Sequence, residues 1–227
     1  MFTHIPHRIT VALFSCGALG VAVTTALEVV TAPYSSSVSL YELNGVVHMI
    51  KVVALAAFVI GLLGVLAHWG ARLGRVGRGA GLALAVATVM GAVPYTFIES
   101  SLDPGLTPAA ANARLDAIYD DHVWVGILAS VAMPIVVLRV LTLAVVVLRR
   151  QLLPIWAPVS NLLSIPVAIA VMVVSESTGV ALPHPPVWIF LGLAMYGAAI
   201  GVSARESNAT RTAPPRSRRT ASTPRSS

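Results

Sequence analysis

The sequence predicts an all-α, polytopic membrane protein in which six transmembrane helices form a bundle. Composition is the first reason. The 227 residues are 56% hydrophobic and only 11% charged, so the chain lacks the polar surface that a soluble domain of this length needs. The second reason is that apolar stretches of membrane-crossing length recur along the chain. The third is that basic and acidic residues alternate between the segments that separate those stretches.

Each apolar stretch is free or nearly free of charge and can cross a hydrocarbon core of about 30 Å as a helix. The expected spans are residues 9–30, 46–68, 79–98, 123–148, 155–175 and 186–204. The first exceeds the usual apolar length of a signal peptide, and Ala26-Leu27-Glu28 is a poor cleavage site, so we expect it to be retained.

The remaining boundaries follow from local signals, taken in chain order. The second span begins after the Asn44-Gly45 turn signal, and a basic turn with several glycines separates it from the third. The fourth follows Asp120, Asp121 and His122. Residues 1–205 therefore form one transmembrane domain. Residues 206–227 are rich in Arg, Pro, Ser and Thr and are predicted to be a disordered, basic cytoplasmic tail.

Charge predicts the orientation. Every acidic residue except Glu206 lies at the end of an odd-numbered span or in the segment that follows it. The opposite segments carry Arg8, Arg72, Arg75, Arg78, Arg149, Arg150 and the tail arginines from Arg205 onward. Because Lys and Arg near span ends are retained in the cytoplasm, both termini are predicted to be on the cytoplasmic side of the cell membrane.

The expected partners follow from this orientation. The net charge of +6 lies in short segments and in the tail, which favours the anionic inner leaflet and membrane lipids over nucleic acid. Glycines and alanines in the second, third and sixth spans predict close helix packing. The same small-residue faces would allow a homo-oligomer.

Two basic residues lie inside spans. Lys51 is predicted to lie about 8 Å below the outer boundary, where it could snorkel, pair with Glu28 or Glu42, or bind a substrate. Arg139 lies about 22 Å along the fourth span from Trp124. Snorkelling to the cytoplasmic headgroups is the favoured interpretation of Arg139, with a buried pair or a lipid headgroup site as the alternative.

The outer ends of the spans repeat one arrangement. Glu28, Glu99 and Glu176 close the odd-numbered spans, and His48, His122 and His184 lie near the starts of the even-numbered ones. Imidazole and carboxylate are ordinary ligands of a divalent metal such as zinc, and Asp121 or Asp120 would add an acid. The competing interpretation is an interfacial belt, because tyrosine, tryptophan, histidine and acids collect at headgroup level. The sequence contains no HExxH or CxxC motif, so the belt is favoured.

Two functional hypotheses remain open. The first is a protein without a cofactor that binds or moves a small molecule or lipid at the outer face, with Glu28, Lys51, Glu99 and His122 lining the opening. The alternative is a membrane-embedded hydrolase. It would use a divalent metal held by His48, His122 and His184, with Asp121 or Glu99 as the general base. The non-enzymatic hypothesis is favoured.

The order of several short motifs is similar to that of a known family. APYSSSVSLYELNG follows the first span, and VPYTFIESSLDPG leads through a polar segment to DDHVWVGILASVAM. Over residues 8–204 this order resembles the bacterial membrane family called domain of unknown function 998. The resembling positions are Tyr34, Ser35, Ser39, Leu43, His122 and Ala129. The resemblance implies a six-helix integral membrane protein and transfers no catalytic residues.

Overall fold

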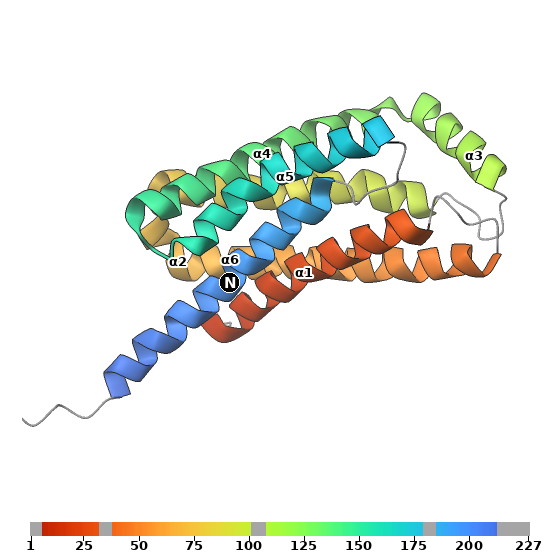
Figure 1. Ribbon diagram of the computed structural model, residues 1–227. Coiled ribbons are helices and arrows are strands. Elements are labelled where there is room, and N and C mark those ends of the chain that lie inside the picture. The colour runs from red at the N-terminus through yellow and green to blue at the C-terminus, as the bar shows by residue number, and fades with distance from the viewer. Residues whose placement is uncertain (1–5, 32–37, 101–107, 179–184, 213–227) are drawn as a thin grey trace, which may run out of the picture.

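The computed structural model describes residues 6–31, 38–100, 108–178 and 185–212, and within these ranges all regular secondary structure is helical (Figure 1). The helices are α1 His7–Thr31, α2 Val38–Ser100, α3 Pro108–Asp121, α4 Val123–Arg150, α5 Trp156–Thr178 and α6 Pro185–Thr212. The all-α part of the predicted fold class is thereby confirmed.

Five helices are long and apolar enough to cross a membrane. Their apolar portions are His7–Leu27, Val46–Ala92, Val123–Arg150, Trp156–Ser175 and Pro186–Ser203. The predicted number was six spans, and the difference lies in α2, whose range contains two of the expected stretches, one on each side of the non-helical residue Gly74.

The long helix α2 bends sharply at Gly74, where φ is 69° and ψ is −175°. Its two arms, residues 38–73 and 75–100, fold back along each other (Figure 1). Leu66 of the first arm lies against Gly81 of the second, so close that a β-carbon on Gly81 would come 2.9 Å from one Leu66 methyl group. The expected spans 46–68 and 79–98 therefore lie on opposite arms of one hairpin.

An arginine from α4 supports the turn of this hairpin. Nη1 of Arg150 donates a hydrogen bond to the backbone oxygen of Arg72 at 2.9 Å. A β-carbon on Gly74 would lie 2.6 Å from Nη2 of the same guanidinium. Two features thus require glycine at this position: the positive φ, and the short distance to the Arg150 guanidinium.

Helix α1 and the first arm of α2 pack with their backbones in direct contact. A β-carbon on Gly17 would collide with the backbone of Phe58, and one on Gly61 with the backbone of Phe14. Small residues at such positions let membrane helices approach closely and gain van der Waals contact. The close packing predicted for glycines of the second span is thus confirmed at Gly61.

The start of α1 is also tied to α2 by aromatic contacts. Nε1–H of Trp69 donates a hydrogen bond to Nε2 of His7 at 2.9 Å. The ring of His68 meets that of His7 edge-on, with centroids 5.3 Å apart. The guanidinium carbon of Arg72 lies 5.4 Å from the centroid of the Trp69 ring, within cation–π range.

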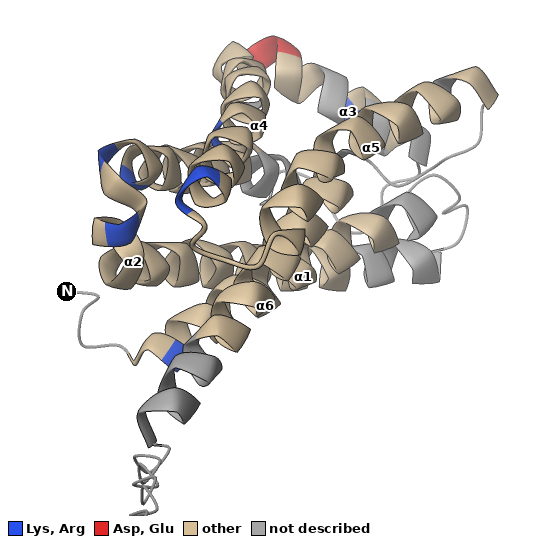
Figure 2. Ribbon diagram, turned by 60° about the vertical axis from the view of Figure 1, so that its left-hand side comes forward, with Lys and Arg blue, Asp and Glu red and all other residues tan. Residues whose placement is uncertain are grey.

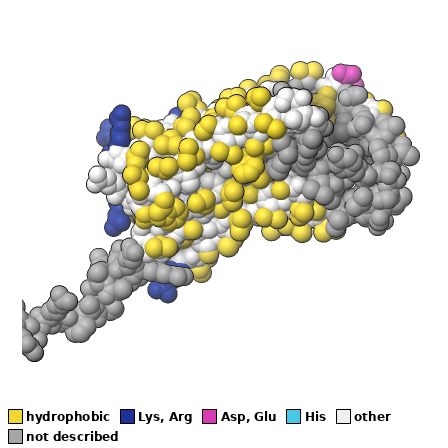
Figure 3. Space-filling model, viewed as in Figure 1, with side chains coloured by type: hydrophobic (Ala, Val, Ile, Leu, Met, Phe, Trp, Pro, Cys, Tyr) yellow, Lys and Arg dark blue, Asp and Glu magenta, His cyan; other side chains and the backbone are white. Residues whose placement is uncertain are grey.

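Charged side chains lie at opposite ends of the bundle (Figure 2). Arginines gather where the α2 hairpin turns and α4 ends, whereas Asp120 and Asp121 lie at the junction of α3 and α4. Between the two ends the surface is largely apolar (Figure 3). Val53 and Leu163 are 67% and 56% exposed, as expected for side chains that face lipid tails. Arg114 on α3 is an exception to this separation, because it lies at the end that carries Asp120 and Asp121.

Two boundaries differ from the sequence-based expectation. Residues 108–121 form the short helix α3, where only a polar segment was expected. Helix α6 continues to Thr212, past the expected end at 204, because no proline interrupts it before Pro214. The first residues of the predicted disordered tail are thus helical, and residues 213–227 lie outside the described ranges.

Candidate ligand-binding cavity

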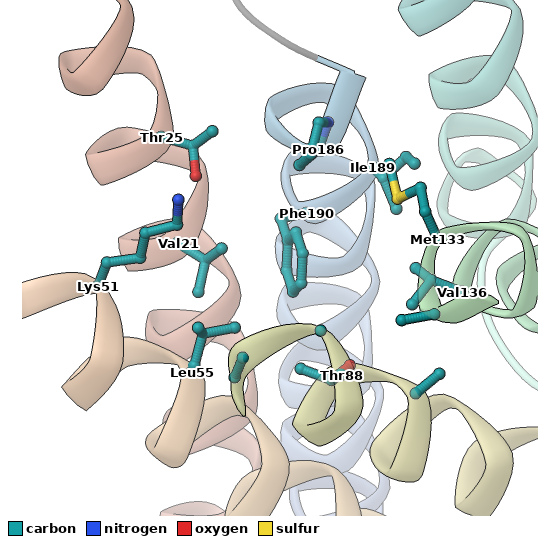
Figure 4. Close-up of a pocket in the computed structure, with 14 residues that line it drawn as sticks. Val21, Thr25, Lys51, Leu55, Thr88, Met133, Val136, Pro186, Ile189 and Phe190 are labelled. Atoms are coloured by element: carbon teal, nitrogen blue, oxygen red, sulfur yellow. The ribbon is translucent and has the colours of Figure 1, made fainter. Parts of the chain in front are cut away.

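A cavity of about 320 Å³ lies between α1, both arms of α2, α4 and α6 (Figure 4). Its volume is at the lower end of the range usual for small-molecule sites. The described lining residues are apolar or small except for three, Thr25, Lys51 and Thr88. The arrangement is therefore a mostly apolar chamber with polar groups at restricted places.

Lys51 and Thr25 provide the polar side of the cavity. Lys51 is on the first arm of α2 and Thr25 is near the end of α1, and the two side chains point toward one another (Figure 4). Thr25 is 3% exposed, and its Oγ1 has no hydrogen-bond partner among the described residues. A buried hydroxyl without a partner is costly, so a ligand acceptor or donor at this point would be favoured.

Neighbouring threonines show why Thr25 differs. Oγ1 of Thr24 donates to the backbone oxygen of Gly20 at 2.7 Å, and Oγ1 of Thr88 donates to that of Leu84 at 2.9 Å. Each of these hydroxyls thus has a hydrogen-bond acceptor in the backbone of its own helix. Thr25 retains its hydrogen-bonding capacity at the cavity wall.

The opposite side of the cavity is built from apolar side chains of α4 and α6. Met133 and Val136 come from α4, and Ile189 and Phe190 come from α6 (Figure 4). The Phe190 ring meets that of Phe58 edge-on at 5.2 Å between centroids. Such edge-to-face pairs resist rearrangement, so this part of the wall is fixed by aromatic packing.

The chemistry available to this cavity is recognition of an anionic amphiphile. A lysine ammonium is a compact charge with three donors, suited to a carboxylate or phosphate oxygen. The apolar part of the cavity beside the ammonium can hold an alkyl chain away from water, which is favourable. The described lining residues include no second titratable group, which a proton relay would need.

Of the predicted ligand-binding residues, some lie at the cavity and others lie elsewhere or outside what the structure describes. Lys51 lines the cavity, whereas His122 lies at the α3–α4 junction and is not among its described lining residues. Glu28 and Glu99 fall within α1 and α2, but their side chains lie outside what the structure describes. Their predicted role in the opening stays a prediction.

The alternative metal set is likewise only partly described. Among the described residues, no three His, Cys, Asp or Glu side chains come together as a metal site would require. His48 is on the first arm of α2, and Asp121 ends α3. His184 lies outside the described ranges. The set of His48, His122 and His184, with Asp121 or Glu99 as base, therefore stays a prediction.

Arg139 lies on α4 outside the described cavity lining. It is partly buried, and its Nε makes no hydrogen bond with the described residues. Whether it snorkels or forms a buried pair stays open. The aromatic belt has clearer support, since Tyr119 and Trp124 are 45% and 41% exposed beside the acidic end.

Thr25 and Thr88 are the two polar lining residues that the sequence did not predict. A useful signal was available for Thr25, because it lies one helical turn before Glu28 in a region already predicted to approach Lys51. Thr88 carried no comparable signal. Its place at the cavity depends on how the α2 hairpin folds back.

No protein-family model, curated protein or solved structure matches the chain. The resemblance to domain of unknown function 998 therefore depends on the quoted motifs alone.

Proposed function

We propose that this is an integral membrane protein that binds an anionic amphiphile, such as a fatty-acid-like carboxylate, in the cavity bounded by Lys51 and Thr25. The observation that carries the proposal is Lys51 lining an otherwise mostly apolar chamber opposite an unsatisfied threonine hydroxyl. The anionic headgroup lies against the ammonium, and the alkyl chain extends toward Phe190 and Val136.

The proposed topology has six crossings, with each arm of α2 as one crossing and both termini cytoplasmic. The hairpin turn at Gly74 supports it, because it places the two apolar arms side by side. The arginines near that turn and at the end of α4 support the orientation through the preference of basic segments for the cytoplasm. The cavity then opens in the outer half of the bilayer.

Binding is favoured over a coupled pump or a hydrolase. Pumps typically place carboxylates or broken helices at membrane mid-depth, and the cavity has neither among its described lining residues. A single ammonium with nearby hydroxyls can orient and retain a ligand. It supplies no acid–base pair.

Lys51 allows a direct test because it is the only lysine in the chain. Reductive ¹³C-methylation of the full-length protein in nanodiscs places an NMR probe on Lys51, with the N-terminal amine as an internal reference. Dodecanoate is expected to shift the Lys51 resonance saturably and to leave the reference unchanged. Dodecyltrimethylammonium, with the same chain and opposite charge, is expected to cause no saturable shift.

Variants extend the test to the cavity itself. Lys51→Met is expected to weaken dodecanoate binding at least tenfold, measured by displacement of a fluorescent fatty acid. The matched control is Arg139→Gln, which removes the other basic residue within a span and should leave binding unchanged. Gly91→Leu should also weaken binding by filling the cavity, since a β-carbon on Gly91 would meet, among the described residues, only Ala132, at 3.6 Å. Equal binding by the Lys51 variant and the unmodified protein would contradict the proposal.

A further inference from the structure

A separate groove lies at the basic end of the bundle, between the start of the second α2 arm and the last turns of α4. Its volume is about 460 Å³. Apolar side chains of both helices form its walls, and Arg149 and Arg150 lie at one end. We call it the Arg149 groove.

The two arginines of the Arg149 groove have different surroundings. Arg150 is held at the hairpin turn by its hydrogen bond to the backbone oxygen of Arg72. Arg149 is exposed and makes no hydrogen bond or ion pair with the described residues. Its guanidinium keeps its donors available for an external acceptor.

The walls of the Arg149 groove face outward. Val76 is 66% exposed and Val145 is 39% exposed, so apolar surface is available beside the arginine. From Leu141 to Arg149 the groove follows α4 for about 12 Å. An apolar trough that ends in a guanidinium matches the order of chain and phosphate in a phospholipid within one leaflet.

We propose that the Arg149 groove binds an anionic phospholipid of the leaflet at the basic end. The phosphate contacts Arg149, and one acyl chain lies along Val76 and Val145. Charge complementarity selects the headgroup, because guanidinium binds phosphate oxygens through paired hydrogen bonds. Basic pockets between membrane helices are a recurrent form of lipid headgroup site.

The hydroxyl of Thr142 does not alter this assignment. It lines the Arg149 groove but already donates to the backbone oxygen of Leu138 at 2.7 Å. The described walls thus carry no unsatisfied polar group that would demand a peptide or sugar. An acyl chain can cover them without leaving a polar atom unpaired.

The test measures which lipids stay with the full-length protein. Protein purified from vesicles with equal phosphatidylglycerol and phosphatidylcholine is examined by native mass spectrometry. Phosphatidylglycerol is expected to be retained preferentially, and Arg149→Gln should lower its retention about fivefold, the change that corresponds to about 1 kcal/mol per basic residue. Arg75→Gln is the matched control, since it removes an exposed arginine of the same end that is not among the described lining residues.

A second variant keeps all charges. Val145→Trp fills the apolar trough and is expected to lower phosphatidylglycerol retention as much as Arg149→Gln does. Equal losses in the Arg149 and Arg75 variants would show general charge attraction in place of a site. Unchanged retention in the Val145 variant would likewise overturn the proposal. The Lys51 resonance is expected to stay the same in all three variants, which separates this site from the proposed cavity ligand.

Discussion

The indole nitrogen of Trp69 and the imidazole of His7 form a hydrogen bond that joins the start of α1 to the first arm of α2, 62 residues away in sequence. Nε2 of His7 is the acceptor, so this nitrogen carries no proton when the bond forms. The bond is partly buried and lies beside His68 and Arg72. It therefore couples two helices at the basic end of the bundle.

A double-mutant cycle measures this coupling. Trp69→Phe, His7→Ala and the double variant are compared with the unmodified protein by denaturant unfolding in detergent micelles. We expect a coupling free energy of about 0.5–1.5 kcal/mol, the usual net contribution of one hydrogen bond. Strict additivity of the two single variants would show that the contact contributes nothing.

Gly61 and Gly79 form a matched pair for testing the backbone contact between α1 and α2. A β-carbon on Gly61 would collide with the backbone of Phe14, whereas one on Gly79 would meet no described atom within 4 Å. Gly61→Ala is expected to destabilise the protein by about 1–3 kcal/mol. Gly79→Ala should be neutral or stabilising by up to about 1 kcal/mol, because alanine is the better helix former.

Thermal unfolding followed by circular dichroism would report both glycine variants. A similar midpoint for Gly61→Ala and Gly79→Ala would mean that α1 and α2 can separate without cost. That result would contradict the close approach described for these helices.

Replacing Asn161 on α5 by an apolar residue is expected to stabilise the protein. It is fully buried, and neither its Oδ1 nor its Nδ2 has a hydrogen-bond partner among the described residues. Replacing a buried unsatisfied polar group by an apolar one of similar shape removes a desolvation cost of about 1–3 kcal/mol. Asn161→Leu is therefore expected to raise the unfolding midpoint.

The neighbouring Ser164 provides the control for Asn161. Its Oγ donates to the backbone oxygen of Asn161 at 2.8 Å, so Ser164→Ala removes a satisfied group and should bring no comparable gain. A fall in the midpoint of Asn161→Leu would show that the amide has a partner, such as a bound water, that stabilises the α5–α6 contact.

The proposed topology can be tested by cysteine labelling, because the chain has a single native cysteine to remove. In a Cys16→Ala background, Asp121→Cys and Arg75→Cys each introduce one thiol at opposite ends of the bundle. In intact cells a membrane-impermeant maleimide is expected to label the Asp121 variant and to label the Arg75 variant only after lysis. Labelling of the Arg75 variant in intact cells would reverse the proposed orientation.

The sequence predicted the apolar segments well, because length and hydropathy are local properties. It did not predict α3, since PAAANARLDAIYDD is neither apolar nor clearly amphipathic. Its alanines and the proline at its first position were the available helix signals.

The cavity was predictable only through Lys51, the one lining residue whose charge is unusual at membrane depth. Thr25 and Thr88 are ordinary residues of apolar helices. Their meeting depends on which faces of α1 and the two α2 arms turn inward, and that is a property of helix pairing. Asn161 is a polar residue inside an apolar span, but that it is fully buried depends likewise on which face of α5 turns inward.

The close contact of α1 with the first arm of α2 at Gly17 and Gly61 implies that some walls of the cavity are more rigid than others. With backbone against backbone, these two helices cannot slide or spread without losing contact along their length. By comparison, α4 and α6 touch each other little. A guest molecule larger than the resting cavity would therefore be accommodated by displacement of α4 away from α6, because α6 is held to α1 and to Phe58, while Thr25 and Lys51 keep their spacing around its headgroup.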